Sequence, residues 1–284
     1  MRIVRGEMAE RETGGGDASI QTTPGEEALR IALEPLTYGE APRILILGDT
    51  RCGKTEIAKR IVAAYLVAEP RGIVIVGDDK NPRQPQFSGQ YYTNPDEIAK
   101  RPPRKEPRVI VCRGNQTEIT GGSNAELYES IARYQWKLTA EGPDGRPSLA
   151  VYDELDRAAA GQQWQVNPSA IGWTYGKGGG VGAGSVALTQ ETEGVPREPF
   201  NQATCIIVVR MMGNPVRLLV KRGYTISRRP DGSLDQRGAA RIIESLPGTE
   251  LPPNQRGYFV VLQRGIPFNG KVYRFDSRRV VAVK

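Results

Sequence analysis

Short apolar runs recur along the chain and are separated by segments with helical spacing. The runs occupy residues 43–47, 73–76, 109–112, 148–152, 184–189 and 204–209. Runs of this length, rich in Val and Ile and bounded by Gly, Pro or charged residues, are typical of strands buried on both faces of a parallel sheet. The pattern predicts an α/β protein in which helices cover both faces of a mainly parallel central sheet.

The segments between the runs predict the helices. The longest, residues 124–139, places Leu127, Ile131, Tyr134 and Leu138 on one face. Further helices are expected at residues 26–33, 54–67, 95–100 (with Asn94 as N-cap) and 165–175. Residues 1–24 are expected to form a mobile arm, because they mix charge with Gly and Thr. Residues 176–180, four glycines around Lys177, are expected to form a flexible connection.

The last part of the chain predicts a β-hairpin. Residues 257–263 and 271–275 combine aromatic, apolar and basic positions and are joined by a segment with Gly265, Pro267 and Gly270. The hairpin would either pack on the edge of the core sheet or present Arg264, Lys271 and Arg274 to phosphates. The predicted domains are an arm with a short helix (1–40), the α/β core (41–212) and a basic extension (213–284).

Composition excludes several classes of protein. Of the 284 residues, 38% are hydrophobic and 25% charged, which is ordinary for a globular protein. No apolar run approaches the roughly 20 residues of a membrane span, so we expect a soluble intracellular protein of the virion or host cytoplasm. Cys52, Cys112 and Cys205 are scattered and are expected to be reduced and buried. The chain has no histidine, so any general base must be a carboxylate.

The net charge of +7 is unevenly distributed. Residues 210–284 hold 15 Lys and Arg against 5 Asp and Glu, whereas the residues before them hold 24 against 27. A basic flank of this kind either follows a polyanion or forms an ordinary solvated surface.

A phosphate-binding loop follows the first apolar run. Residues 48–55 fit the pattern G-x-x-x-x-G-K-[ST] and lie between a predicted strand and a predicted helix, the context that this motif requires. The loop amides and the helix N-terminus would bind the phosphates of ATP, Lys54 would reach the β- and γ-phosphates, and the Thr55 hydroxyl would bind Mg²⁺. The nucleotide-binding residues are therefore Gly48, Asp49, Thr50, Arg51, Cys52, Gly53, Lys54 and Thr55.

A second motif ends the run at residues 148–152. Asp153 and Glu154 follow it directly, as in a Walker B motif, in which the first acid holds Mg²⁺ through water and the second polarises the attacking water. Gln190 ends the run at 184–189 and would contact the γ-phosphate or its water, or else only cap the strand. We expect the nucleotide to lie between two neighbouring strand ends, with Lys54 on one and the two acids on the other.

This order of motifs resembles the FtsK–HerA class of P-loop ATPases. The resemblance covers residues 43–212 and is carried by the phosphate loop, Asp153-Glu154, Thr189-Gln190 and the Val195-Pro196 that follows. It implies a three-layer P-loop NTPase fold of the RecA-like (ASCE) type. It also makes Glu154 the catalytic base and Gln190 a polar sensor. Members often carry an arginine finger before the Gln-bearing strand; here the connection contains Lys177, so Arg197 and Arg210 are the substitutes.

The small size makes the chain look most like genome-packaging ATPases of membrane-containing icosahedral viruses. The resemblance implies a homo-oligomeric ring, a hexamer or pentamer, that drives double-stranded DNA into a capsid without reading its sequence. A capsid vertex or membrane proteins would be its docking partners. Residues 163–180 and the tail from Arg210 are the candidate DNA contacts. The alternatives are a filamentous-phage assembly ATPase, a plasmid-transfer motor, and a P-loop kinase or regulatory NTPase.

Overall fold

The computed structural model describes most of the chain. The described residues are 22–78, 86–92, 97, 108–113, 124–141, 145–155, 170–190, 195, 197–250, 252 and 257–275. The arm expected at residues 1–21, the helix expected at 95–100 and the first half of the helix expected at 165–175 lie outside them, apart from residue 97. Residues 22–24, expected in the arm, instead form strand β1 (Thr22–Pro24).

A mainly parallel sheet organises the molecule. Its strand order is β1-β12-β11-β8-β2-β7-β6-β3-β5-β4. The strands from β8 to β4 run parallel to one another, whereas β11 is antiparallel to β8 and to β12. Their bounds are Arg43–Leu47 (β2), Ile73–Gly77 (β3), Gln90–Tyr92 (β4), Val109–Cys112 (β5), Ser148–Tyr152 (β6), Ala183–Thr189 (β7), Cys205–Val208 (β8), Tyr258–Leu262 (β11) and Val272–Arg274 (β12). All six apolar runs are therefore strands, as predicted.

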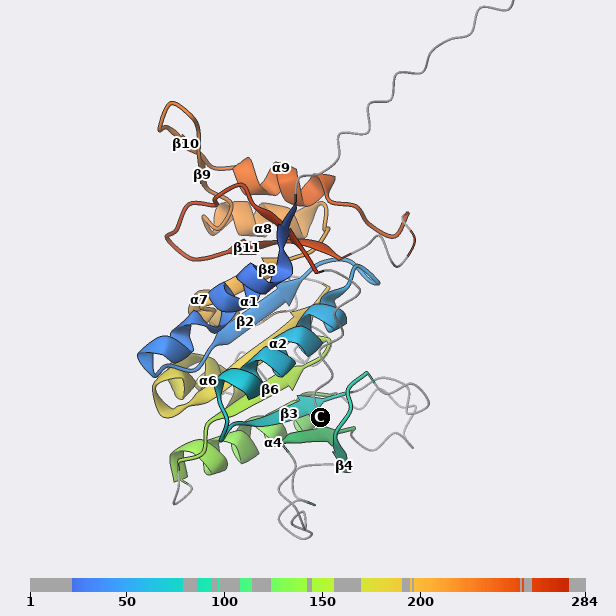
Figure 1. The fold of residues 1–284 in the computed structure, drawn as a ribbon, viewed down its shortest axis with the longest axis vertical. Helices are drawn as coiled ribbons and strands as arrows, with labels where there is room; N and C mark the ends of the chain where they lie inside the picture. Colours follow the sequence, from blue (N-terminus) through green and yellow to red (C-terminus); the bar gives the residue numbers. More distant parts are fainter. Residues whose placement is uncertain are drawn as a thin grey trace, which may run out of the picture.

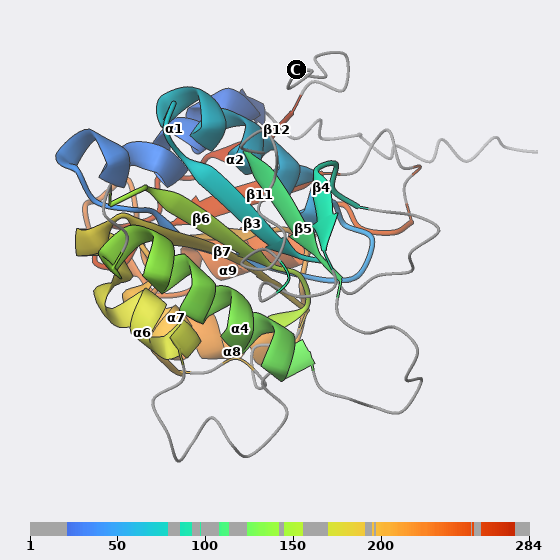
Figure 2. The same ribbon diagram turned by 90° about the horizontal axis from the view of Figure 1, so that it is seen from below.

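Helices cover both faces of the sheet (Figures 1 and 2). One face packs against α1 (Gly25–Leu33), its 3₁₀ continuation Glu34–Tyr38 and α2 (Lys54–Ala68). The other face carries α4 (Asn124–Trp136), α6 (Ala170–Lys177), α7 (Arg197–Gln202), α8 (Asn214–Lys221) and α9 (Gly238–Ser245). Alternate residues of β2 point to opposite layers: Ile44 and Ile46 join the α2 side, and Leu45 and Leu47 the α4 side. The predicted three-layer α/β fold is confirmed.

The glycine-rich connection before β7 is packed, so the prediction of a flexible segment is wrong. α6 ends at Lys177 and continues as a 3₁₀ segment, Gly178–Val181. Gly178 and Gly179 are buried, and a Cβ on Gly178 would lie only 2.5 Å from the Ala183 carbonyl oxygen. Glycine is required here because two backbone segments pass too closely for a side chain.

The C-terminal hairpin packs on the core edge. β11 pairs antiparallel with β8, with Val260 opposite Val208 and Leu262 opposite Ile206. Its cations have partners within the chain: Arg264 donates to the Asn201 carbonyl, Lys271 to Glu27 and Arg274 to the Tyr258 hydroxyl. Of the two predicted roles, the structure therefore favours the structural one.

The residues after 212 share the core of the preceding part. Val216 and Leu219 of α8 and Ile243 of α9 belong to the same apolar cluster as Ile206 of β8. A separate two-stranded ribbon, β9 (Ser227–Arg228) and β10 (Leu234–Asp235), connects α8 to α9. The division of the chain at residue 212 stays a prediction. Among the described helices, none combines the length and the apolar character needed to cross a bilayer.

Candidate active site

The predicted phosphate loop joins β2 to α2 and has the backbone shape that its glycines permit. Gly48 has φ 141° and Gly53, the N-cap of α2, has φ 102°; Arg51 has φ 62°. A Cβ on Gly48 would lie 2.2 Å from Val209 Cγ2 and 2.9 Å from the Arg210 carbonyl oxygen. The first glycine therefore serves both the turn and the close approach of the β8 end.

Lys54 is held over the loop. Its side chain is only 9% exposed, and its Nζ donates hydrogen bonds to the carbonyl oxygens of Gly48 (2.6 Å) and Asp49 (2.9 Å). An ammonium group fixed by carbonyls beside the first turn of a helix is placed where phosphate oxygens would be bound. Partial desolvation raises the pKa of the Asp49 carboxyl, which lies at the exposed surface of the loop, and the nearby charges of Lys54 and Arg210 partly offset this rise.

The acidic pair lies at the end of β6. Asp153 is 2% exposed, and its carbonyl oxygen accepts a hydrogen bond from the Tyr128 hydroxyl. Glu154 adopts φ 57°, the left-handed region that a residue with a side chain rarely occupies. Such strain is commonly found at functional sites, where the surrounding structure maintains it.

Tyr128 is a support that the sequence analysis did not identify. It is fully buried on α4 and meets the Tyr152 ring edge-on at 5.4 Å. Gly77, at the end of β3, makes room for it, since a Cβ there would lie 2.5 Å from the Tyr128 ring. The tyrosine was visible in the sequence only as part of a helix, and nothing in its spacing links it to Asp153.

Gln190 connects the phosphate loop to the acidic pair. The Thr50 hydroxyl donates to Gln190 Oε1 at 2.5 Å, and Gln190 Nε2 donates to Glu154 Oε1 at 3.2 Å. The expectation that the loop strand and the acid strand are neighbours is wrong, because β7 lies between β2 and β6. Gln190 follows the last residue of that intervening strand, so its side chain bridges the gap. Thr50 was predicted only as a loop residue.

Arg210 lies beside the phosphate loop of its own chain. The Asp49 N–H donates to the Arg210 carbonyl at 2.9 Å, and the guanidinium pairs with Glu250 at 2.5 Å. Glu250 also accepts the Gly248 N–H. Arg197 begins α7, and its side chain is outside the described part of the structure. The roles predicted for these two arginines stay predictions.

Lys177 lies near the amino end of β2, whereas the phosphate loop follows its carboxyl end. It ends α6, and the next turn meets the beginning of the β2 segment through the Ala41 N–H, which donates to Gly179 O. Its Nζ lies 4.9 Å from the centre of the Trp173 ring. Because the phosphate loop follows the other end of β2, Lys177 cannot reach the site of its own chain.

The three cysteines are buried free thiols, as predicted. Burial raises the pKa of both Cys112 and Cys205 to about 12. Cys52, within the phosphate loop, is 2% exposed. Neither Cys112 nor Cys205 suits a nucleophile, because the thiolate is the reactive form.

The fold is similar to that of solved genome-packaging NTPases. No protein-family model and no curated protein matches the chain. The genome packaging NTPase B204 from Sulfolobus turreted icosahedral virus 2, in complex with AMPPCP, is 17% identical over 83% of this chain and 98% of its own, with a TM-score of 0.57. B204, the DNA-packaging ATPase from Sulfolobus turreted icosahedral virus, is 17% identical over 78% and 92%, with a TM-score of 0.50. This likeness confirms the predicted P-loop NTPase fold, which the chain shares with these two packaging enzymes.

Proposed function

We propose that the protein is an ATP-hydrolysing motor that translocates double-stranded DNA and packages it into a preformed viral capsid. The observation that carries the proposal is the hydrogen-bonded path from Thr50 through Gln190 to Glu154, which links the phosphate loop to the acidic pair across three strands. A protein that only binds nucleotide needs the loop alone. Hydrolysis adds the need for a positioned group that can take the proton of the attacking water, and the Gln190 amide holds the Glu154 carboxylate in such a position.

The binding half of the site follows from the loop. The amides of residues 48–53 and the N-terminus of α2 receive the phosphates of ATP, which attracts the Lys54 ammonium away from the loop carbonyls. The lysine then neutralises charge on the β- and γ-phosphates. Asp49 and Arg51 are both exposed in the loop and would lie beside the outer face of the nucleotide.

The residues fit Mg²⁺. The ion prefers oxygen ligands and usually keeps several waters, so one hydroxyl and one carboxylate suffice beside the phosphates. Thr55, the second residue of α2, and the buried Asp153 would supply them. No group of three or more acidic or cysteine side chains that could form a complete metal cage occurs within the described residues, and such a site needs none. Bound Mg²⁺ would neutralise charge that develops between the β- and γ-phosphates.

The catalytic half uses the carboxylate and its partner amide. Glu154 orients the attacking water and accepts its proton, while the Gln190 amide fixes the carboxylate in position. The same glutamine contacts Thr50, so a displacement of the loop by nucleotide reaches Glu154 through a single side chain. Arg197 or Arg210 supplies the positive charge that stabilises the transition state.

The motor assembly is argued from the fold. The similar solved structures carry genome-packaging names and were solved with nucleotide analogues. We infer a homo-oligomeric ring, a hexamer or pentamer, that grips the DNA backbone without reading bases and acts in the host cytoplasm or the virion. A capsid vertex or membrane proteins would dock it.

Steady-state ATPase activity measured against added duplex DNA, with mass determined under the same conditions, tests the proposal. DNA should stimulate hydrolysis by an oligomer, and the stimulation should fall steeply between low and physiological salt, because cations that bind phosphates displace counterions. A monomer that hydrolyses ATP without any response to DNA would contradict the motor and favour a kinase or regulatory NTPase.

Two variants separate binding from catalysis in this assay. Lys54→Ala should lose nucleotide binding, whereas Glu154→Gln should retain it while turnover falls by about 10²- to 10⁴-fold, the usual contribution of a general base. Bound nucleotide is measured with a fluorescent ATP analogue. A fully active Lys54→Ala protein would reject the phosphate-loop assignment, and unchanged turnover in Glu154→Gln would remove the glutamate from its role.

A further inference from the structure

A basic lobe follows the core between residues 214 and 245. It contains seven Lys and Arg against three Asp and Glu. The β9–β10 ribbon projects from this lobe, away from the body of the sheet (Figure 1). The segment that follows β11 meets the ribbon, since Phe268 pairs with Ser227. β11 ends opposite the beginning of β8. The ribbon therefore lies on the side of the amino ends of the parallel strands, whereas the phosphate loop lies at their carboxyl ends.

All three acids of the lobe are already engaged. Glu244 lies 3.6 Å from Arg237, and Asp231 accepts the Ser233 N–H and hydroxyl, which closes the tip of the ribbon. Asp235 is 8% exposed and pairs with both Arg229 (3.8 Å) and Arg241. The three carboxylates therefore stabilise the structure of the lobe through contacts within it.

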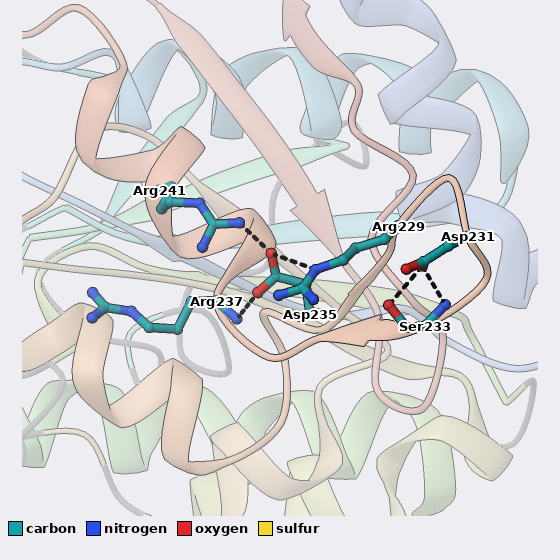
Figure 3. Close-up of polar contacts among 6 residues, drawn as sticks. All are labelled: Arg229, Asp231, Ser233, Asp235, Arg237 and Arg241. Carbon is teal, nitrogen blue, oxygen red and sulfur yellow. Dashed lines mark hydrogen bonds and ion pairs between the residues drawn. The ribbon is translucent and has the colours of Figure 1, made fainter.

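Asp235 fixes two guanidinium groups from different elements. Figure 3 shows its carboxylate between Arg229 of the ribbon and Arg241 of α9, with the Arg237 N–H on its other oxygen at 3.0 Å. The hydrogen bond from Arg241 and that from the Arg237 N–H lower the pKa of this carboxyl, so it stays ionised. A buried acid that holds two arginines in fixed positions prepares them for a third partner.

The two arginines, together with Arg228, line a cavity of about 640 Å³. Asp235 is the one acid on the cavity wall, against the three arginines that line it, so the cavity carries surplus positive charge. Arg228 is exposed and forms no ion pair with the described residues. We call this site the arginine cavity; Gly238, Phe268 and Asn269 complete its wall.

We propose that the arginine cavity binds a backbone phosphate of duplex DNA. The proposal rests on the proposed function, in which DNA is the substrate, and it adds the residues that hold the DNA and the edge of the molecule where it lies. A guanidinium presents planar donors that match two phosphate oxygens, and Arg228 is free to supply them. A two-stranded ribbon is also narrow enough to enter the major groove of a duplex while its flank contacts phosphates.

Equilibrium binding of a fluorescent duplex of random sequence, followed by anisotropy over a salt series, tests this site in the full-length protein. Arg228→Ala should weaken binding by about three- to tenfold near 0.1 M salt and reduce the slope of log K against log salt by about one, the loss of one phosphate contact. Arg228→Lys should keep the slope and recover part of the affinity, because it keeps the charge and loses the fork. Arg133→Ala, which removes an exposed cation from α4, is the matched control and should bind as the unaltered protein does.

The outcomes distinguish this site from the motor itself. ATP turnover without DNA should be equal in all four proteins, which shows that they are folded. If the unaltered protein binds no duplex, the proposed function and the site fail together. If it binds duplex and Arg228→Ala binds equally well with the same slope, only the arginine cavity is rejected. Polyglutamate serves as a probe for acidic proteins. If Arg228→Ala loses binding to polyglutamate while its binding to DNA is unchanged, the proposal is likewise overturned and the cavity is assigned to an acidic protein.

Discussion

The candidate site depends on single side chains that come from separate parts of the sequence. Thr50 belongs to the loop after β2, Glu154 to the turn after β6, and Gln190 to the end of the strand between them. Neither Thr50 nor Glu154 reaches the other directly, so Gln190 is the residue that makes them one unit. The Gln190 amide is thus the hydrogen-bonded link between the acid and the loop.

A double-mutant cycle tests this linkage. Thr50→Val and Gln190→Ala should each lower kcat by roughly fivefold, because a hydrogen bond that orients the carboxylate is worth about 1 kcal/mol. The double variant should lose little more than either single one, since both changes break the same path. Steady-state ATPase measurements on the unaltered protein, the two single variants and the double variant provide the four values of the cycle. Losses that multiply would show that Thr50 and Gln190 act independently.

At the scale of elements, the phosphate loop is shaped by its neighbours as well as by its own sequence. Gly48 faces Val209, and the Asp49 N–H is held by the Arg210 carbonyl. The end of β8 therefore forms one side of the loop. A motif of eight residues describes the loop, whereas its support comes from a strand more than 150 positions later.

Gly48→Ala should disrupt this support. The new Cβ would meet Val209 Cγ2 at 2.2 Å at a φ that side chains rarely adopt, so we expect a loss of about 2–4 kcal/mol in the free energy of unfolding. Gly180→Ala is the matched control, because nothing lies within 4 Å of its Cβ position. Urea denaturation followed by circular dichroism measures both. Equal stability of the two variants would show that the loop relaxes away from β8.

The elements that the sequence predicted best are those whose signal is local. The six buried strands and the 124–139 helix follow from apolar periodicity, and the phosphate loop from its motif. The strand order could not be predicted in this way, because the register between β2, β7 and β6 depends on contacts far apart in the chain. The connection at Gly178 was misjudged for the same reason: its composition suggests flexibility, and only the approach of Ala183 shows why glycine is needed.

The C-terminal hairpin, formed by β11 and β12, is predicted to be structural. Phe259 is fully buried and stacks on Tyr273 at 5.7 Å and on Phe275 at 5.3 Å. Phe259→Ala should lower the free energy of unfolding by about 3–5 kcal/mol, the usual loss for a buried phenylalanine. Lys271→Ala removes an exposed cation from the same hairpin and should leave both the urea midpoint and duplex binding unchanged. Weakened DNA binding in that variant would restore the role that the sequence first allowed for this hairpin.

At the scale of the whole molecule, the two proposed sites lie at opposite ends of the parallel strands. The nucleotide site lies at the carboxyl ends of β2, β7 and β6, and the arginine cavity lies near the beginning of β8. β8 and its neighbour β11 run between them, and Arg210, at the site end of β8, pairs with Glu250 from the segment that follows α9.

Mixed assemblies decide which arginine acts between subunits. Arg210 lies beside the loop of its own chain, so it should act within one subunit: a mixture of inactive Arg210→Ala and inactive Glu154→Gln proteins should stay inactive. If Arg197 is the finger, Arg197→Ala mixed with Glu154→Gln should recover ATPase activity, because a Glu154→Gln subunit supplies its intact arginine to a neighbour with an intact acidic pair. Turnover measured over a range of mixing ratios, with native mass spectrometry to show that mixed assemblies form, tests both. Recovery in the Arg210 mixture would place that guanidinium in the site of the adjacent subunit and require it to leave Glu250 on assembly.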